Sequence, residues 1–508
     1  MATYYKKRVL IFIVAYHAES TIASVLTRIP ASLLDAYDVD VLIIDDSSGD
    51  LTFAKSHEAA RQAGIPFDVR VLFNPVNQGY GGNQKLGYRY AIEHGYDYVA
   101  LIHGDGQYAP ECLPDLLAAF GEGNPAAVYG SRMMTPAGAL HGGMPFYKYL
   151  GNKTLTWIQN RLLRSHLTEF HSGYRLYSVD ALRSIPFERN SNDFHFDTEI
   201  IIQLMFFAKR EIRELPIPTY YGDEICRVNG ISYAMNVVLA TLKARLQELG
   251  IFYDRRYDCA PVALEHYTPK FEYPSTHSFA FKLVPPNSRV LDLGCAGGYM
   301  AAALKQRKDC YVTGVDAFPL EGGVRLDKFY LRNLNEGLDG LPIADQDMIL
   351  MLDVIEHLAS PERFLDQLHE SLSKNPGMQI IMSTANIGFI IPRLMLLIGQ
   401  FNYGKRGILD VTHTRLFTFS SFRRCLEQCG FDVLEMRAVP GPFPLALGDT
   451  WLSRLLLRAN QLMMKVSRGL FGYQIFARIK PRPTVAYLLE AAHVESDRKV
   501  RALEAVSG

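Results

Sequence analysis

The feature that most constrains the fold is an alternation of short apolar runs with helical stretches, which begins twice along the chain. In the first half the apolar runs cover residues 8–16, 39–45, 69–73, 96–103 and 126–131. Stretches with helical patterning, such as TIASVLTRI and NQKLGYRYAIEHG, separate most of these runs. Buried runs alternating with helices are typical of a parallel sheet covered by helices. The first half is therefore predicted to have an α/β fold.

A second series of the same kind begins at Arg289, with RVLDLG, CYVTGVD, DMILMLDVIEHL and MQIIMST as its apolar runs. The preceding residues, 254–286, are rich in Pro, Tyr and His and show little periodicity, which is typical of a linker. We predict one α/β domain over 1–255, a linker over 256–285 and a second α/β domain over 286–508.

Composition narrows the function and the compartment. Lys and Arg together number 53, as do Asp and Glu, so the formal net charge is zero and general nucleic-acid binding is disfavoured. The seven cysteines are scattered without a CxxC pair, which favours reduced thiols in the cytoplasm. Charge-free apolar runs of about 18 residues are absent from the sequence, so we expect no spanning helix.

In the first half, polar clusters follow three of the predicted strands, at residues 15–19, 45–50 and 103–107. Open α/β sheets bind ligands at the carboxyl ends of their strands. Carboxylates there could accept hydrogen bonds from a nucleoside or hold a divalent cation through oxygen ligands. The alternative is that the same residues only cap helices and form turns.

These clusters belong to a larger set of motifs: VAYHAE, IIDDSSGD, the loop NQGYGGN from Asn77, Gly130-Ser131-Arg132, Ser172-Gly173-Tyr174-Arg175 and Phe196-Asp197-Thr198-Glu199. With them, residues 8 to about 225 resemble family 2 glycosyltransferases of the dolichyl-phosphate mannosyltransferase type. The resemblance implies a GT-A (Rossmann-like) fold, a nucleotide-diphospho-sugar donor and Mg²⁺ or Mn²⁺.

The resemblance also implies roles for individual residues. Donor binding falls to residues of the first motifs: Ala15, Tyr16, Glu19, Asp45, Asp46, Asn77, Gly79 and Lys85. The metal falls to Asp105 and Gln107, with His103 standing where the family usually has an aspartate; imidazole is a poor ligand for Mg²⁺ and a better one for Mn²⁺. Arg132 is expected to contact phosphate. The saccharide or polyprenyl-phosphate acceptor is expected near Lys148, Asn152, Ser172 and Arg175.

The charge balance of the transfer suggests further catalytic groups. Cleavage of the donor leaves a negatively charged diphosphate, which the metal and Arg132 can neutralise. A hydroxyl acceptor also needs a general base, for which Asp197 and Glu199 are candidates, although both could simply cap the next helix. A phosphate acceptor is already anionic and needs no base.

In the second half, a strand leads through Asp292 into the glycine-rich turn Gly294-Cys295-Ala296-Gly297-Gly298. About twenty residues later Asp316 ends the next predicted strand, where its carboxylate could bind ribose hydroxyls. A dinucleotide-binding unit would show a similar acidic residue. The turn, however, reads Gly-x-x-Gly-Gly, and LDVIEHL follows at 352–358.

With these motifs, residues 286 to about 435 are similar to class I S-adenosylmethionine-dependent methyltransferases of the ubiquinone-biosynthesis type, which have a Rossmann-like fold. The similarity implies that Asp292 and the turn (Gly294, Cys295, Gly297 and Gly298) hold the methionine moiety, that Asp316 holds the ribose and that Asp353 lies near the sulfonium. It places Glu356 and His357 beside the acceptor. An oxygen acceptor would benefit from a base, for which His357 and His413 are candidates.

Two apolar stretches complete the sequence reading. Residues 387–401 could cover a substrate pocket or form core. Residues 451–471 place Arg454, Arg458, Lys465 and Arg468 on one helical face, opposite a broad apolar arc, as in helices that lie on a membrane surface. An ordinary surface helix is the alternative.

The whole sequence thus predicts a bifunctional enzyme that glycosylates and methylates a saccharide or lipid-linked product. We expect it in the cytoplasm, with a peripheral position on the inner face of the membrane as an extension of that expectation. Two other functions remain open: a glycosyltransferase with a non-catalytic methyltransferase-like scaffold, and a membrane-docked assembly protein.

Overall fold

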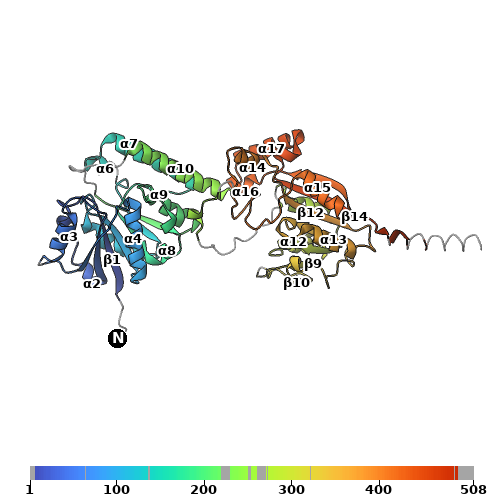
Figure 1. Cartoon of the computed structure of the whole chain (residues 1–508), viewed down its shortest axis with the longest axis horizontal. Helices are drawn as coiled ribbons and strands as arrows, with labels where there is room; N and C mark the ends of the chain where they lie inside the picture. The colour runs from blue at the N-terminus through green and yellow to red at the C-terminus, as the bar shows by residue number, and fades with distance from the viewer. Residues whose placement is uncertain are drawn as a thin grey trace, which may run out of the picture. The chain divides into compact units, whose positions relative to one another are not determined.

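The computed structural model divides into two compact units (Figure 1). Unit 1 comprises Met1–Glu248 and Asp254–Leu264, and unit 2 comprises Leu249–Tyr253 and Glu265–Gly508. The structure describes residues 6–62, 64–135, 138–218, 229–249, 253–259, 271, 273–320, 322–485, 487–489 and 493.

Unit 1 is built on a seven-stranded sheet with the order β3-β2-β1-β4-β6-β5-β7. Most neighbouring strands are parallel, and β6 alone runs antiparallel to both β4 and β5. The strands are β1 (Lys7–Ala15), β2 (Tyr37–Asp45), β3 (Asp68–Phe73), β4 (Tyr98–His103), β5 (Ala127–Ser131), β6 (Arg175–Ser178) and β7 (Ile212–Pro216). The predicted α/β class is confirmed for this half.

Helices cover both faces of this sheet because successive side chains of a strand point to opposite faces. In β1, Leu10 and Phe12 pack with Tyr88 of α4 in one core, while Ile11 and Ile13 pack in a second core. The helices are α1 (Ile22–Thr27), α2 (Leu33–Ala36), α3 (Thr52–Ala60), α4 (Tyr80–Glu93), α5 (Leu113–Ala118), α6 (Gly138–His141), α7 (Phe146–Leu163), α8 (Val179–Arg183), α9 (Phe196–Ile201) and α10 (Gly230–Glu248).

Unit 2 contains a second seven-stranded sheet, with the order β10-β9-β8-β11-β12-β14-β13. Its strands are parallel except β14, which is antiparallel to β12 and β13. The strands are β8 (Arg289–Leu293), β9 (Tyr311–Asp316), β10 (Lys328–Leu331), β11 (Met348–Leu352), β12 (Gln379–Ala385), β13 (Phe431–Val439) and β14 (Gln474–Pro481). The predicted α/β class is confirmed here as well.

The helices of unit 2 again pack into two cores. Phe364 and Phe422 belong to the core on one face, and Ala280 and Met300 to the core on the other. The helices are α11 (Thr276–Leu283), α12 (Tyr299–Lys308), α13 (Pro361–Ser371), α14 (Ile390–Leu397), α15 (Phe419–Gln428), α16 (Phe443–Leu447), α17 (Trp451–Val466) and α18 (Arg468–Phe471).

Both ends of the predicted linker, 256–285, pack on a unit. Tyr257 is buried in unit 1, where its ring stacks on Phe207 with centroids 5.3 Å apart. Helix α11 packs against the sheet of unit 2 through Ala280. Residues 260–270 and 272 lie outside the described residues.

The structure also bears on the expectation that the chain has no membrane-spanning helix. Among the described residues, none of the helices combines the length and the apolar character needed to span a bilayer.

Candidate functional sites

In unit 1 the three predicted polar clusters meet at the carboxyl edge of the sheet. The register pairs Ala15 of β1 with Asp45 of β2, and Val14 with His103 of β4. Because these strands are parallel and adjacent, the residues that follow them lie along one edge. The strands therefore bring the candidate donor-binding and metal-binding residues together.

Asp45 has an unusual environment at this edge. Its side chain is fully buried, and Oδ1 accepts a hydrogen bond from the backbone N–H of Ser48 at 3.0 Å. The other oxygen, Oδ2, is enclosed and has no hydrogen-bond partner among the described residues. An unsatisfied buried acceptor costs about 1–3 kcal/mol, so Asp45 is suited to accept a hydrogen bond from a ligand.

Asp46 organises the loop that precedes α4. Its carboxylate accepts hydrogen bonds from the Asn74 side chain at 2.7 Å and from the backbone N–H groups of Gln78 and Gly79 at 2.8 and 3.0 Å. Asn77 donates from Nδ2 to the Asp46 carbonyl at 2.9 Å. Asp46 and Asn77 thus shape the edge of the donor site from within the protein.

The other predicted donor contacts have mixed surroundings. Tyr16 and Glu19 are exposed, and Glu19 accepts a hydrogen bond from the backbone of Leu51 at 2.9 Å. Gly79 has φ = 79°, and a Cβ there would lie 2.6 Å from the Asn192 carbonyl oxygen, so only glycine fits. Lys85 donates to Asn192 Oδ1 at 2.6 Å and to the Asn190 carbonyl, so its ammonium lies against residues 190–192.

The predicted metal ligands lie in the turn after β4. Asp105 is exposed and accepts a hydrogen bond through Oδ1 from the Gln107 backbone at 3.0 Å. Burial lowers the pKa of His103, although the carboxylates of Asp105 and Asp197 act in the opposite direction. Groups of three or more His, Cys, Asp or Glu side chains suited to a metal ion are absent from the part of the chain that the structure describes. An oxygen donor such as Asp105 fits a cation whose remaining ligands come from a substrate diphosphate.

Arg132 is held by a carboxylate that the sequence analysis did not identify. Its Nε and backbone N–H donate to the two oxygens of Glu169 at 3.0 and 2.7 Å, and Nη2 donates to the His171 carbonyl at 3.1 Å. Burial alone would raise the pKa of Glu169, but the adjacent Arg132 outweighs it and the pKa is lowered. Asn152 also donates to Glu169, at 2.8 Å.

The expected roles of Arg132 at a phosphate and of Asn152 at the acceptor stay predictions, and the structure shows what holds the two side chains. Both side chains are buried, and both donate hydrogen bonds to the Glu169 carboxylate. Arg132 and Asn152 thus act on the site through Glu169, the carboxylate to which both donate. Lys148, in the first turn of α7, is half-buried, and Ser172 is buried beside Tyr174.

Asp197, Glu199 and Arg175 are likewise held by partners within the protein. Asp197 accepts hydrogen bonds from Tyr80 at 3.0 Å and Gln84 at 3.2 Å and forms an ion pair with Arg175. The Arg175 guanidinium is fully buried and donates to three backbone carbonyls, and its place beside the sugar acceptor stays a prediction.

Glu199 is fully buried as well. It accepts a hydrogen bond from the Ser191 backbone at 2.6 Å and pairs with Arg256. A general base needs access to a substrate proton, and Glu199 has none in this arrangement. Both acidic residues thus have structural partners, and their role as general bases stays a prediction.

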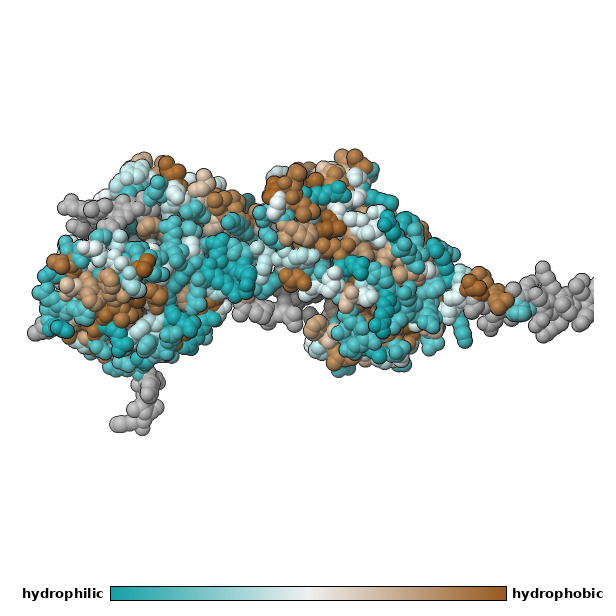
Figure 2. Space-filling model, in the orientation of Figure 1, coloured by the Kyte–Doolittle hydropathy of each residue, from teal (hydrophilic) through white to brown (hydrophobic). Residues whose placement is uncertain are grey.

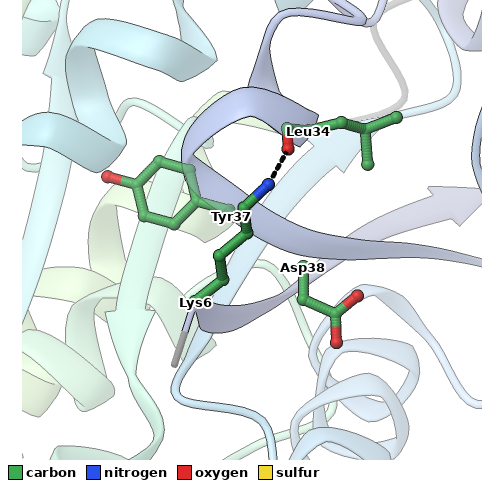
Figure 3. A pocket seen from close by; sticks show the side chains of 4 residues that line it. All are labelled: Lys6, Leu34, Tyr37 and Asp38. Atoms are coloured by element: carbon green, nitrogen blue, oxygen red, sulfur yellow. Dashed lines mark hydrogen bonds between the residues drawn. The ribbon is translucent and has the colours of Figure 1, made fainter. Parts of the chain in front are cut away.

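A surface hollow of about 430 Å³ lies elsewhere on unit 1 (Figure 3). Lys6, Leu34, Tyr37 and Asp38 line it, and Lys6 Nζ donates to the Leu34 carbonyl at 2.6 Å. These residues are at the amino ends of β1 and β2, opposite the edge that carries the polar clusters. The hollow is therefore separate from the candidate site.

In unit 2 the glycine-rich turn follows β8 as predicted. Gly294 has φ = 76°, and a Cβ there would lie 2.3 Å from a methyl group of Val354, so a side chain is excluded. The backbone N–H groups of Gly294 and Cys295 donate to the Val315 carbonyl at 2.7 and 3.2 Å, which ties the turn to β9. Gly298 has φ = 83° and begins α12, and Gly297 precedes it half-buried.

Two carboxylates flank this turn. Asp316 accepts hydrogen bonds from the backbone of Ala296 at 2.7 Å and of Phe318 at 2.9 Å, so it holds the turn while leaving further acceptor capacity. Asp292 is buried, and its Oδ2 has no partner among the described residues. Burial, with a smaller contribution from Asp316, raises the pKa of Asp292 to about 7. A cationic ligand group would satisfy this oxygen.

Asp353 and Glu356 lie beyond the end of β11. Asp353 has φ = 56°, a left-handed conformation that is uncommon outside glycine, and its oxygens accept from Ser383 and Gln474, both at 2.7 Å. Glu356 is buried, accepts from the Ala385 backbone at 3.1 Å and has an unpartnered Oε2 among the described residues. Burial and the neighbouring Asp353 raise the pKa of Glu356 to about 8.

The two candidate histidines lie side by side, with ring centroids 4.8 Å apart. Nδ1 of His357 contacts the Thr412 carbonyl at 3.2 Å, and Nδ1 of His413 contacts the Ile408 carbonyl at 2.9 Å. A carbonyl only accepts, so each Nδ1 carries the hydrogen and each neutral ring has its lone pair on Nε2. Burial lowers the pKa of His413, which favours this neutral form. The pair can therefore accept a proton.

Residues that the sequence analysis missed mainly support others. Glu169 neutralises Arg132, Tyr80 links His103 to Asp197, and Gln474 and Ser383 hold Asp353. Glu169 gives no local signal, because its partner Arg132 is 37 residues away in the sequence. Tyr80 lies inside the glycine-rich loop already singled out, whereas Gln474 gives no local signal.

Comparisons with known proteins agree with this geometry. Residues 10–185 match the family model for glycosyl transferase family 2, and residues 264–436 match a model for a methyltransferase domain. The undecaprenyl-phosphate mannosyltransferase of Micrococcus luteus is 30% identical over 215 residues, which cover 41% of this chain and 82% of that protein. The polyprenol monophosphomannose synthase of Mycolicibacterium smegmatis is 28% identical, covering 35% of this chain and 64% of that protein.

The relative of the second unit covers a smaller part of both chains. A ubiquinone biosynthesis O-methyltransferase of Xylella fastidiosa is 31% identical over 109 residues, which cover 20% of this chain and 42% of that protein. The predicted fusion of two transferase domains is confirmed. The chain is thus an enzyme that belongs to glycosyl transferase family 2 through its first unit and carries a methyltransferase domain in its second.

Proposed function

We propose that unit 1 transfers a sugar from a nucleotide-diphospho-sugar to a polyprenyl-type lipid phosphate. The observation that favours this acceptor over a saccharide hydroxyl is the state of the two predicted bases. Asp197 pairs with Arg175, and Glu199 pairs with Arg256. An acceptor phosphate is already anionic, so it can attack without either of them. The names of the relatives from Micrococcus luteus and Mycolicibacterium smegmatis support the same acceptor class.

The donor would lie along the carboxyl edge of the first sheet. Asp45 Oδ2 would accept a hydrogen bond from the nucleoside, and the Asp46-ordered loop would shape its surroundings. Asp105 and Gln107 would hold Mg²⁺ or Mn²⁺, which when bound supplies positive charge to the diphosphate leaving group.

The surface formed by α7 and α10 supports a lipid-linked acceptor. The two helices pack against each other within unit 1. They expose large apolar side chains to solvent: Phe146, Tyr147, Leu150 and Trp157 from α7, and Ile231, Met235, Leu239 and Leu242 from α10. An exposed apolar surface of this size is typical of contact with a lipid or another protein. Helix α7 also carries Lys148 and Asn152, so a lipid held there would bring its phosphate to the network around Glu169.

Transfer by the purified full chain tests this proposal. A panel of nucleotide-sugars is incubated with Mn²⁺ and a short-chain polyprenyl phosphate, and glycolipid formation is measured. We expect one donor to give product and Asp105→Ala to give none. Transfer to a free saccharide, with no transfer to the lipid phosphate, would show that the acceptor class is wrong.

We further propose that unit 2 transfers a methyl group from S-adenosylmethionine to an oxygen of the glycan or of the lipid-linked product. Asp292 would accept from the cofactor ammonium, and Asp316 would accept from the ribose hydroxyls. The Nε2 lone pairs of His357 and His413 can take the proton of an attacking hydroxyl. The histidine pair is the observation that favours a catalytic domain over a scaffold.

Methyl-labelled S-adenosylmethionine distinguishes these alternatives. We expect label to appear in the product of unit 1 and the His357→Ala/His413→Ala variant to bind cofactor without transferring its methyl group. Cofactor binding with no label in any glycosylated product would favour the scaffold function.

We also propose a peripheral position on the inner membrane face. Unit 2 exposes apolar side chains on α14, α16 and α17: Leu394, Leu396, Leu397, Leu445, Trp451, Leu452, Leu455, Leu462, Met463 and Val466. Figure 2 shows hydrophobic surface over the part of unit 2 that contains these helices. We name this set the unit 2 apolar surface. Arg458, Lys465 and Arg468 provide positive charge for anionic headgroups, whereas Arg454 pairs with Asp449 at 2.6 Å.

A further inference from the structure

His103 occupies the position where the family usually has an aspartate, and its ring is fixed by its surroundings. It is the last residue of β4 and lies two residues before Asp105. A Cβ on Gly173 would lie 2.5 Å from His103 Cε1, so the ring packs directly against that backbone. Tyr108 contacts the ring edge-on, with centroids 5.1 Å apart.

The hydrogen bonds of Tyr80 determine which ring nitrogen of His103 carries the proton. The Tyr80 hydroxyl is 3.0 Å from Asp197 Oδ2 and 3.1 Å from His103 Nε2. The Tyr80 hydroxyl donates to Asp197 Oδ2, which also pairs with Arg175. The single hydroxyl proton of Tyr80 therefore goes to Asp197, and its oxygen accepts from Nε2–H of His103.

The other nitrogen, Nδ1, is then left with its lone pair. Nδ1 of His103 makes no hydrogen bond with any of the described residues. It is also not one of the fully enclosed polar atoms that lack a partner among these residues. Nδ1 thus keeps a lone pair that none of the described residues uses. A histidine whose second nitrogen donates to an oxygen is the usual arrangement of a metal-binding imidazole.

We infer that His103 binds the divalent cation through Nδ1, together with Asp105, and that the Asp197–Tyr80 pair is what orients it for this purpose. The consequence is metal selectivity. Imidazole suits Mn²⁺ better than Mg²⁺, which prefers oxygen ligands, so this substitution in the family motif makes the transferase a Mn²⁺-preferring enzyme. Tyr80 is a positioning residue that acts through His103. The inference rests on the proposed nucleotide-sugar transfer.

Pulsed electron paramagnetic resonance tests the inference without relying on turnover. The full chain is loaded with MnCl₂ in the presence of uridine or guanosine diphosphate, and nitrogen-14 coupling to the bound Mn²⁺ is recorded. We expect coupling from a directly bound imidazole in the wild type and its loss in His103→Asp. We also expect His103→Asp to shift the ratio of Mn²⁺ to Mg²⁺ affinity at least tenfold toward Mg²⁺.

Tyr80→Phe tests the orienting bond. Removal of a group that hydrogen-bonds a metal ligand typically weakens metal binding by about 10–100-fold. We expect Tyr80→Phe to have this effect when His103 is present and to have no further effect when it is combined with His103→Asp. Tyr96→Phe is the matched control, because it also removes a tyrosine hydroxyl bonded to a carboxylate, Asp40 at 2.7 Å, but at the opposite end of β4. Thermal unfolding confirms that each variant is folded.

The outcomes separate the inference from the function on which it rests. Mn²⁺ and nucleoside diphosphate binding without nitrogen coupling would contradict the role of His103 alone. Equal Mn²⁺ affinity in Tyr80→Phe and the wild type would contradict the orienting role of Tyr80. A folded chain that binds neither the metal nor either diphosphate would contradict both this inference and the proposed donor.

Discussion

At the scale of single residues, the buried carboxylates of this chain fall into two groups. Some have a cationic partner and stabilise the fold, and others have an oxygen without a partner that a ligand can use. Glu169 is satisfied by Arg132, whereas Asp292 has an unpaired oxygen and a raised pKa. A satisfied pair contributes to the fold, and an unsatisfied acceptor is available to a ligand. Each case gives a prediction.

The raised pKa of Asp292 predicts pH-dependent cofactor binding. Below its pKa of about 7 the carboxyl is protonated and attracts the cofactor ammonium less. The affinity for S-adenosylmethionine should therefore rise roughly tenfold or more between about pH 5.5 and about pH 7.5, as calorimetry can measure. Asp292→Asn should bind weakly at both values and show little of this dependence. A wild type whose affinity is unchanged over this range would contradict the role of Asp292.

The same group has a consequence for stability. A carboxyl whose folded-state pKa lies above its unfolded value keeps a proton that the unfolded chain releases. Asp292 therefore makes unit 2 less stable as the pH rises from about 4 to about 7. Thermal unfolding of Asp292→Asn should depend less on pH in this window than that of the wild type.

The Glu169–Arg132 pair predicts a large stability effect in unit 1. The two side chains are 0% and 7% exposed, so removal of Glu169 would leave Arg132 buried without its main partner. Glu169→Ala should lower the free energy of unfolding by about 3–5 kcal/mol. The control is Glu111→Ala, whose partner Arg28 is exposed and whose loss should cost about 0–1 kcal/mol. Similar losses in the two variants in urea unfolding would show that burial does not set the value.

At the scale of elements, the sequence predicted the strands that a continuous run of apolar residues marks. The runs at 8–16, 39–45 and 96–103 became β1, β2 and β4, and their polar ends meet because adjacent parallel strands end together. Strands β6 and β7 were missed, since RLYS and IRELP mix charged and apolar residues over four and five positions and form no apolar run.

Long-range pairs limited the prediction of the site. Glu169 and Arg132 are 37 residues apart, and Tyr80 and Asp197 are 117 apart. Nothing in either local sequence shows that these side chains meet, because the pairing is created by the tertiary fold. The sequence therefore could not show that Arg132 and Asn152 both bind Glu169, or that Asp197 and Glu199 pair with Arg175 and Arg256.

Helix α17 gives a prediction at this scale. Trp451 and Val466 are 76% and 84% exposed, and the helix carries no acidic side chain. Binding to anionic vesicles should exceed binding to neutral vesicles and should fall with added salt. Replacing Arg458 and Lys465 of α17 and Arg468 of α18 with Gln should abolish the difference between vesicle types.

A matched control separates charge from apolar contact. Trp451→Ser/Val466→Ser should reduce sedimentation with both vesicle types while leaving the salt dependence in place, because it removes exposed apolar surface and no charge. Equal sedimentation of the wild type with neutral and anionic vesicles would contradict the electrostatic contribution.

At the scale of the whole molecule, the segment after α10 determines where the chain can be divided. The sequence placed the end of the first domain at residue 255. In the structure Arg256 pairs with the fully buried Glu199, Tyr257 stacks on Phe207, and Cys259 Sγ contacts the Gln203 carbonyl at 3.6 Å. These contacts belong to unit 1, so residues 256–259 complete its core.

A fragment of residues 1–264 should therefore fold cooperatively and be more stable than a fragment of residues 1–255. The shorter fragment leaves the Glu199 carboxylate buried without Arg256 and exposes the surface that Tyr257 covers. Each loss is worth about 1–3 kcal/mol or more. Thermal unfolding of both fragments measures the difference, and Arg256→Ala/Tyr257→Ala in the longer fragment should reproduce most of it. If the two fragments unfold at the same temperature, these contacts contribute nothing to unit 1 and the boundary predicted from the sequence is the better one.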